Sequence, residues 1–216
     1  MGRTMTIDFV SDISCPWCVI GLRGLQEALA RTTDVIDARI NFQPFELNPD
    51  MPPEGENIVE HIAGKYGTTP DQSAATRQMI HDRAAALDFE MAMSEERRIY
   101  NTFDAHRLLH WAGIEGRQQE LKEALFEAYF TLGQNPSNHE VLAATAEKVG
   151  LDDAAAREVL ASGRYAGEVR RAEQLWRERG ISAVPAVIID GRYLISGGQP
   201  PEAFEQALRQ IALEAA

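Results

Sequence analysis

The sequence predicts an α/β protein whose two ends build one mixed sheet, with an all-helical segment inserted between them. Two observations support this prediction. Strand-like segments lie near both ends of the chain, and the first pair of strands is joined by a helix, as a parallel crossover requires. The middle of the chain instead has helical periodicity. We therefore expect residues 1–50 and 164–216 to form a discontinuous sheet domain, and residues 51–163 to form the inserted helical domain.

The first elements follow from local pattern. Residues 5–11 alternate β-branched or aromatic residues with polar ones, which predicts a strand. Pro16 suits the first turn of a helix, and apolar residues spaced three and four apart continue that helix to about Arg31. A second strand is expected over residues 38–45, where Ile40 and Phe42 alternate with polar neighbours.

The middle of the chain is expected to be helical. Gly113, Gly133 and Gly150 each follow a periodic segment and are expected to end helices. The expected helices cover residues 57–66, 71–87, 101–112, 117–132, 138–149 and 153–161. One apolar stripe predicts core packing, and its members are Leu121, Ala124, Leu125, Ala128, Tyr129 and Leu132.

The pattern reverses near the carboxyl end. A helix over residues 165–179 precedes a buried-looking strand at residues 186–189. Asp190 and Gly191 predict a hairpin turn, and residues 193–195 form the return strand. Pro200 and Pro201 open a last helix that ends near Leu213.

Composition excludes several classes of partner. No apolar run approaches the ~20 residues that a membrane span requires. The net charge of −12 disfavours nucleic acid, whose binding needs clustered lysine and arginine. The first ten residues lack the features of an export signal, so a cytoplasmic location is expected.

The two cysteines carry the functional prediction. Cys15 and Cys18 are the only cysteines in the 216 residues, and they lie three positions apart. A closed structural zinc site needs four ligands, so no metal is expected. A structural disulfide closing so short a loop would constrain little of the unfolded chain, and the cytosol would reduce it. Redox chemistry is the remaining interpretation.

The position of the pair explains how it would act. Cys15 falls between a strand and the start of a helix, where backbone N–H groups and the helix dipole favour a thiolate. Cys18 lies one turn further along, close enough to attack a mixed disulfide formed on Cys15. We expect Cys15 to be partly exposed and Cys18 to be buried behind it. Trp17 either covers the site with an apolar surface that contacts substrate or merely packs.

Three motifs resemble those of one family. They are Val-Ser-Asp-Ile-Ser-Cys-Pro-Trp-Cys at residues 10–18, Asn-Thr-Phe-Asp-Ala-His-Arg-Leu-Leu-His-Trp-Ala at 101–112, and Gly-Ile-Ser-Ala-Val-Pro at 180–185. Together they resemble the DsbA-like branch of the thioredoxin superfamily, specifically its FrnE-type subgroup. The resemblance covers essentially the whole chain and implies a thioredoxin fold with an inserted helical domain.

The resemblance also implies roles. Cys15 would be the attacking cysteine, Cys18 the resolving one, and Pro185 a cis proline that faces them across a cleft. A cis proline there would expose the backbone of Val184, with which an extended substrate could pair as an added strand. The expected partner is a disulfide-containing peptide or small molecule. No cofactor is expected beyond the dithiol, with glutathione as a candidate electron donor, and the oligomeric state is left open.

The helix at residues 101–112 has a mixed face formed by Phe103, His106, Arg107 and His110. These side chains either line a cleft and contact substrate, or form a solvated surface with the histidines satisfied by neighbours. Metal binding by the two histidines is disfavoured, because no glutamate lies between them to make the zinc-hydrolase pattern.

A proton acceptor for Cys18 is also expected. Asp8, Asp12 and Glu46 are the candidates, since all three lie near predicted strand ends. The sequence does not choose among them.

Two other functions remain as alternatives. Kappa-class glutathione transferases and 2-hydroxychromene-2-carboxylate isomerases have a related scaffold, but they carry serine where Cys15 stands, and glutathione performs the chemistry. The other alternative is a chaperone or binding module. For a dithiol enzyme, the fold supports potentials from about −120 to about −270 mV, so the scaffold does not set the direction. The reducing cytosol favours disulfide reduction or isomerisation.

Overall fold

The structure is a computed structural model that describes residues 2–52, 54–92, 94 and 96–214. The elements up to the third helix are β1 (Arg3–Ser11), α1 (Pro16–Arg31), β2 (Ile36–Pro44), β3 (Glu56–Asn57), α2 (Ile58–Tyr66) and α3 (Pro70–Ala85). Those that follow are β4 (Arg98–Ile99), α4 (Phe103–Ile114), α5 (Gln118–Phe126), the π-helical turn η1 (Glu127–Thr131), α6 (His139–Lys148), α7 (Asp153–Ser162), α8 (Ala166–Glu178), β5 (Ala186–Ile189), β6 (Tyr193–Ser196) and α9 (Pro201–Glu214).

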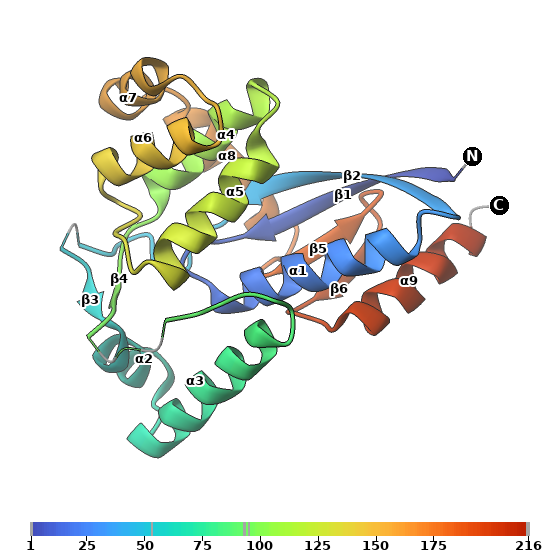
Figure 1. The fold of residues 1–216 in the computed structure, drawn as a ribbon, viewed down its shortest axis with the longest axis horizontal. Coiled ribbons are helices and arrows are strands. Elements are labelled where there is room, and N and C mark those ends of the chain that lie inside the picture. The colour runs from blue at the N-terminus through green and yellow to red at the C-terminus, as the bar shows by residue number, and fades with distance from the viewer. Residues whose placement is uncertain (1, 53, 93, 95, 215–216) are drawn as a thin grey trace.

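Both ends of the chain build one sheet, as predicted. Its strand order is β2-β1-β5-β6, and Figure 1 shows the blue amino-terminal strands beside the orange carboxyl-terminal ones. β1 pairs with β2 in parallel and with β5 in antiparallel register, with Ile7 opposite Ile189 and Val10 opposite Ala186. The hairpin after β5 has positive φ at both Asp190 and Gly191, as a two-residue turn of this kind requires.

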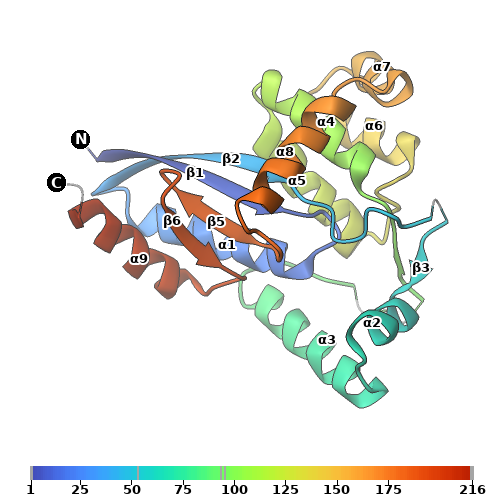
Figure 2. The same ribbon diagram turned by 180° about the vertical axis from the view of Figure 1, so that it is seen from behind.

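Helices cover both faces of the sheet. α1 and α9 pack side by side on one face, and α8 lies on the other, as Figure 2 shows from behind. The alternation along β1 explains this layering, since Phe9 belongs to the cluster that contains α1 and α9, whereas Val10 packs with Trp176 of α8.

The helices between β2 and α8 form the insertion. Their core is continuous with that of the sheet, because Phe9, Cys18, Leu121 and Leu142 belong to one buried cluster. We keep the division at residues 50/51 and 163/164 as a proposal. Within the described part of the chain, no helix is both long and apolar enough to cross a membrane.

Two local predictions need correction, and one strand pairing was not predicted. Gly113 does not end α4, which runs to Ile114, because a glycine inside a helix costs only about 1 kcal/mol and the packing of α4 outweighs it. The helix expected over residues 117–132 ends in the π-helical turn, which leaves Leu132 exposed instead of in the core. The short β3–β4 pairing has too few residues for a sequence signal.

The carboxylate of Asp12 ties three segments together. Asp12 lies between β1 and α1, and its Oδ2 accepts the Leu47 N–H after β2 at 2.7 Å and the Ser14 hydroxyl at 3.0 Å. Its Oδ1 accepts the Thr102 hydroxyl before α4 at 2.7 Å and lies 3.5 Å from His106 Nε2. Burial alone would raise the pKa of Asp12, but His106 and these donors outweigh it and lower the pKa to about 2.

The pH dependence of stability follows from this carboxylate. The pKa of Asp12 falls from its ordinary 3.8 to about 2 on folding, so the ionised form contributes about 2 kcal/mol above pH 4. This contribution is lost as the pH falls from about 4 to 2. We expect Asp12→Asn to lower the free energy of unfolding at pH 7 by about this amount, with a difference from wild type that shrinks below pH 4. Urea denaturation across this pH range measures it.

The matched control for Asp12→Asn is Asp82→Asn, which changes an exposed carboxylate on α3. Among the described residues, this carboxylate is hydrogen-bonded only to Gln78 and His81 of its own helix. Its stability should stay close to that of wild type at every pH. A pH-independent difference between Asp12→Asn and wild type would show that the Asp12 charge does not lock the fold.

A second prediction concerns the packing of α1. A Cβ added at Gly24 would lie 2.7 Å from the carbonyl oxygen of Gln199, in the loop before α9. We expect Gly24→Ala to lower the free energy of unfolding by about 1 kcal/mol or more, because this overpacking outweighs the gain in helix propensity. Gly64→Ala on α2, where a Cβ meets nothing within 4 Å, should raise it by about 0.5–1 kcal/mol. Equal effects of the two substitutions would contradict the packing argument.

Candidate active site

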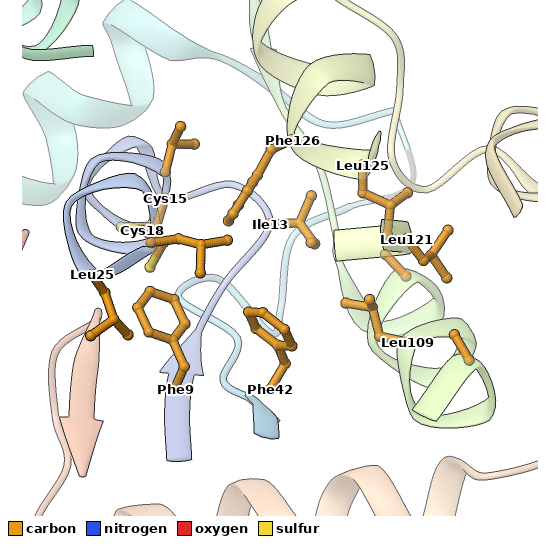
Figure 3. Close-up of a cluster of buried hydrophobic side chains, with 14 of the residues drawn as sticks. Phe9, Ile13, Cys15, Cys18, Leu25, Phe42, Leu109, Leu121, Leu125 and Phe126 are labelled. Atoms are coloured by element: carbon orange, nitrogen blue, oxygen red, sulfur yellow. The ribbon is translucent and has the colours of Figure 1, made fainter. Parts of the chain in front are cut away.

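The two cysteines occupy the first turn of α1. Cys15 is the N-cap residue, with extended backbone angles of φ −93° and ψ 112°, and Pro16 opens the helix. The Cys18 N–H donates to the Cys15 carbonyl at 3.0 Å, so both side chains leave the same turn. Figure 3 shows the two sulfurs above Phe9, with Phe126 of the insertion beside them. Both are free thiols.

Cys15 and Cys18 differ less in solvent exposure than the sequence predicts. Cys18 is fully buried, but Cys15 is itself only 3% exposed, so the prediction of a partly exposed Cys15 is wrong for this structure. The loop before β5 causes this, because Cys15 Sγ lies against the Val184 carbonyl and donates to it at 3.6 Å. The pKa of the Tyr66 hydroxyl on α2 is raised, chiefly by partial burial and to a smaller extent by the charge of Cys15.

The Val184–Pro185 peptide bond is cis, as the resemblance implies. The Pro185 ring packs on α1 one turn beyond the dithiol, where a Cβ at Gly21 would come within 2.9 Å of Pro185 Cγ. A glycine at this position therefore allows the loop to close on the helix. The arrangement places Val184 directly opposite Cys15.

Trp17 packs between elements. Its indole lies under the guanidinium of Arg83 from α3, 5.2 Å from the ring centroid, and against Gly198 before α9. Of the two alternatives for Trp17, the structure shows packing, and contact with substrate stays a proposal.

The pKa of Cys18 lies well above its ordinary value. Burial is the largest cause, followed by the hydrogen bond and the charge of Cys15, while the charge of Lys122 and the backbone of Asp12 act in the opposite direction. Cys18 is therefore a protonated thiol at neutral pH, and it has to lose its proton before it can attack a disulfide.

Lys122 is the site residue that sequence reasoning missed. It lies on α5 with only 1% of its surface exposed, and its Nζ is 4.9 Å from the centroid of Phe126. Burial lowers its pKa to about 8, although the negative charges of Cys18, Asp12 and Cys15 favour the ammonium. The one sequence signal for a buried Lys122 is its spacing from Phe126. The two residues lie four positions apart on a helix whose apolar side is buried, so their side chains can meet.

The mixed face of α4 is not solvated. His106 and Arg107 are both buried, so that alternative is wrong for these two residues. His106 meets Asp12, beside the dithiol loop. The Arg107 guanidinium instead donates to the carbonyls of Leu160, Val159 and Arg164 at the end of α7, because the last carbonyls of a helix lack partners within it.

The structure thus does not bring Arg107 to the dithiol, and substrate contact by it is not supported. Phe103 is half-buried under the guanidinium of Arg170, 3.7 Å from its ring centroid. The ring of His110 contacts that of Tyr165 in a tilted arrangement, with centroids 5.1 Å apart, and burial lowers the pKa of His110. Apart from His106, the residues of this face therefore contact α7, α8 and the segment between them.

The three candidate proton acceptors lie in different surroundings. Asp8 accepts from the Gln43 amide at 2.8 Å. Glu46 is paired with Arg170, and burial together with the neighbouring Glu173 raises its pKa to about 7. Of the three, only Asp12 acts on Cys18, and it does so through its backbone. With a pKa of about 2, its carboxylate is a poor proton acceptor at neutral pH. Among the described residues, no group of three or more His, Cys, Asp or Glu is arranged to hold a metal ion.

Two proteins resemble this chain along nearly its whole length. The crystal structure of the probable DsbA oxidoreductase SCO1869 from Streptomyces coelicolor has a TM-score of 0.90 at 33% identity, covering 98% of this chain and 91% of that one. The uncharacterised protein YwbO of Bacillus subtilis (strain 168) is 28% identical over 206 residues, which are 95% of this chain and 96% of YwbO.

Two more distant structures share the fold alone. A 2-hydroxychromene-2-carboxylate isomerase has a TM-score of 0.72 at 16% identity, with 97% of each chain covered. The cytosolic disulfide reductase DsbM from Pseudomonas aeruginosa, solved with GSH, has a TM-score of 0.61 at 16% identity, covering 95% of this chain and 98% of that one. They confirm the related scaffold that the sequence implied.

The family comparison agrees with these structures. The model of the DSBA-like thioredoxin domain matches residues 6–209, a range that takes in the dithiol, the helical insertion and the cis-proline loop. The predicted fold class, a thioredoxin fold with an inserted helical segment, is thereby confirmed. Since the match extends from β1 to α9, this chain belongs to the DSBA-like thioredoxin domain family.

Proposed function

We propose that this protein is a thiol–disulfide oxidoreductase that reduces or rearranges disulfides, with Cys15 attacking and Cys18 resolving. One observation carries the proposal: Cys15 lies at the N-terminus of α1 against the Val184 carbonyl, and the fully buried Cys18 lies behind it. In this proposal the first thiol reacts with the substrate and the second reacts with the first.

The reaction runs in two steps. The Cys15 thiolate attacks one sulfur of the substrate disulfide, the S–S bond breaks, and the other sulfur leaves as a thiolate. Cys18 then loses its proton and attacks Cys15 Sγ, which releases the second substrate thiolate and leaves a Cys15–Cys18 disulfide. Two electrons have passed to the substrate. A thiol donor such as glutathione would return them to the protein.

The Val184 carbonyl supplies a second function. It accepts the Cys15 thiol hydrogen in the free protein, so ionisation of Cys15 releases this acceptor. A substrate backbone N–H could then bind the carbonyl, which would align the substrate as an added strand beside the sulfurs. The substrate is accordingly a disulfide-containing peptide or small molecule.

The proposed direction is reduction or isomerisation in the cytoplasm. A glutathione pool at roughly −220 to −320 mV would keep even a strongly oxidising dithiol reduced, so it would act as a donor of electrons. The fold shared with a cytosolic disulfide reductase is compatible with this direction.

The first functional prediction separates the roles of the cysteines. With glutathione as the donor, wild type should reduce or rearrange a model peptide disulfide. Cys15→Ser should abolish the exchange, and Cys18→Ser should accumulate mixed disulfides on Cys15, because the resolving thiol is missing. Non-reducing electrophoresis and mass spectrometry of acid-quenched samples measure both outcomes.

The control for the cysteine variants is the double Cys15→Ser, Cys18→Ser protein, which should fold and be inert. If wild type cannot exchange any test disulfide with the donor present, the oxidoreductase proposal fails. If the double variant retains a glutathione-dependent isomerase activity or suppresses aggregation as well as wild type does, those alternatives gain support instead.

The second functional prediction concerns the cis-proline loop. Pro185→Thr adds a hydroxyl and an N–H to the loop whose Val184 carbonyl contacts Cys15, where proline has neither. We expect the mixed disulfide on Cys15 to persist several-fold longer, because the new polar groups can hold the bound substrate. Quenched time courses measure this lifetime. Pro70→Thr, in the first turn of α3, is the matched control and should leave it unchanged. Equal lifetimes in Pro185→Thr and wild type would refute the role of the loop.

A further inference from the structure

A lysine from the insertion shares the interior with the dithiol. Lysine is almost never fully buried unless it is paired, yet Lys122 ranks among the largest fully buried side chains of the described residues. It comes from α5, so it reaches the sheet domain from a different part of the chain. Leu121, Leu125 and Phe126 of the same helix pack in the cluster that contains both cysteines, as Figure 3 shows.

After burial, the negative charges of three groups act on Lys122. They are Cys18 in α1, Cys15 at its N-cap and Asp12 in the loop before it, and His106 Nε2 of α4 lies 3.5 Å from Asp12 Oδ1. The Asp12 carboxylate is already engaged by hydrogen-bond donors from Ser14, Leu47 and Thr102. Of the three groups, Cys18 has the largest effect on the lysine, and the lysine in turn favours the Cys18 thiolate.

The resolving step requires a base that takes the proton of the Cys18 thiol. Cys18 is buried and protonated, and bulk water does not reach it to take its proton. Asp12 stays ionised to about pH 2 and is too weak a base. A buried lysine is a suitable base, because burial brings the equilibrium between its amine and ammonium forms close to neutral pH.

We propose that the neutral amine of Lys122 accepts the Cys18 thiol proton when Cys18 resolves the mixed disulfide. This proposal rests on the oxidoreductase function proposed above. The transfer creates an ammonium and a thiolate together, so the net charge of the buried cluster does not change. The thiolate then attacks Cys15 Sγ, the bond to the substrate sulfur breaks, and the electron pair leaves with the substrate thiolate. The ammonium afterwards returns its proton to solvent, so that the amine is restored.

The kinetic test isolates this step. Wild type is reacted with an aromatic disulfide reagent, and release of the coloured thiol from Cys15 is followed by stopped flow against pH. With Lys122→Met, the resolving rate should fall roughly 100-fold at pH 7 and recover as the pH rises and hydroxide takes over. Lys122→Arg keeps the charge but is never a neutral base, so it should also be slow. Lys148→Met, an exposed lysine on α6, is the matched control.

A second measurement does not depend on exchange. The ultraviolet absorbance of the Cys18 thiolate is titrated in the Cys15→Ser protein and in the double variant that also carries Lys122→Met. Loss of the lysine should raise the pKa of Cys18 by about one unit or more, a tenfold loss of thiolate at a given pH. Thermal unfolding should show the Lys122→Met protein to be folded, because removal of a buried charge often stabilises a protein.

The outcomes separate the two proposals. Slow resolution with a shifted Cys18 titration supports Lys122 as the acceptor. An unchanged titration overturns it, whatever the rate, because a slow rate alone would show only a structural effect. A shifted titration with a wild-type resolving rate also overturns it. If wild type fails to exchange disulfides at all, the oxidoreductase function falls first, and the proposed resolving step falls with it.

Discussion

The buried carboxylate of Asp12 is the constraint on which the rest of the site depends. One side chain holds the dithiol loop, the segment after β2 and the start of α4, through Ser14, Leu47 and Thr102. Because these segments come from both the sheet and the insertion, the carboxylate fixes how the two parts meet. The packing of the insertion on the sheet also positions the face of α5 that carries Lys122 against α1.

Much of this architecture could be predicted from local pattern. The alternation along β1, the turn at Asp190 and the apolar run of β5 each have a period or a residue type that allows few alternatives. Cys15 and Cys18 were identifiable because two cysteines at this spacing, between a strand and a helix, have few other uses. Such signals depend only on neighbouring residues in the sequence, so they can be recognised without a structure.

The interior polar groups could not be found in this way. Lys122 shares α5 with the exposed Glu120, and His106 shares α4 with the partly exposed Asp104. Only the packing of the insertion on the sheet makes Lys122 and His106 internal. The sequence pattern of α4 suggested that Arg107 lines a cleft. In the structure its guanidinium instead donates to carbonyls at and just beyond the end of α7. The sequence contains no local record of which helix end lies beside which arginine, so burial had to be read from the fold.

The discontinuous sheet has a consequence for biosynthesis. Cys15 and Val184, which meet in the finished site, are separated by 169 positions in the chain. Domains form as the chain emerges from the ribosome, with its amino-terminal part first. The two thiols are therefore made early, while the strand and loop that cover them are made late. A nascent chain that stops between the end of β2 and the start of β5 carries both thiols and one unpaired edge of β1, so the redox centre is completed only when synthesis is nearly finished.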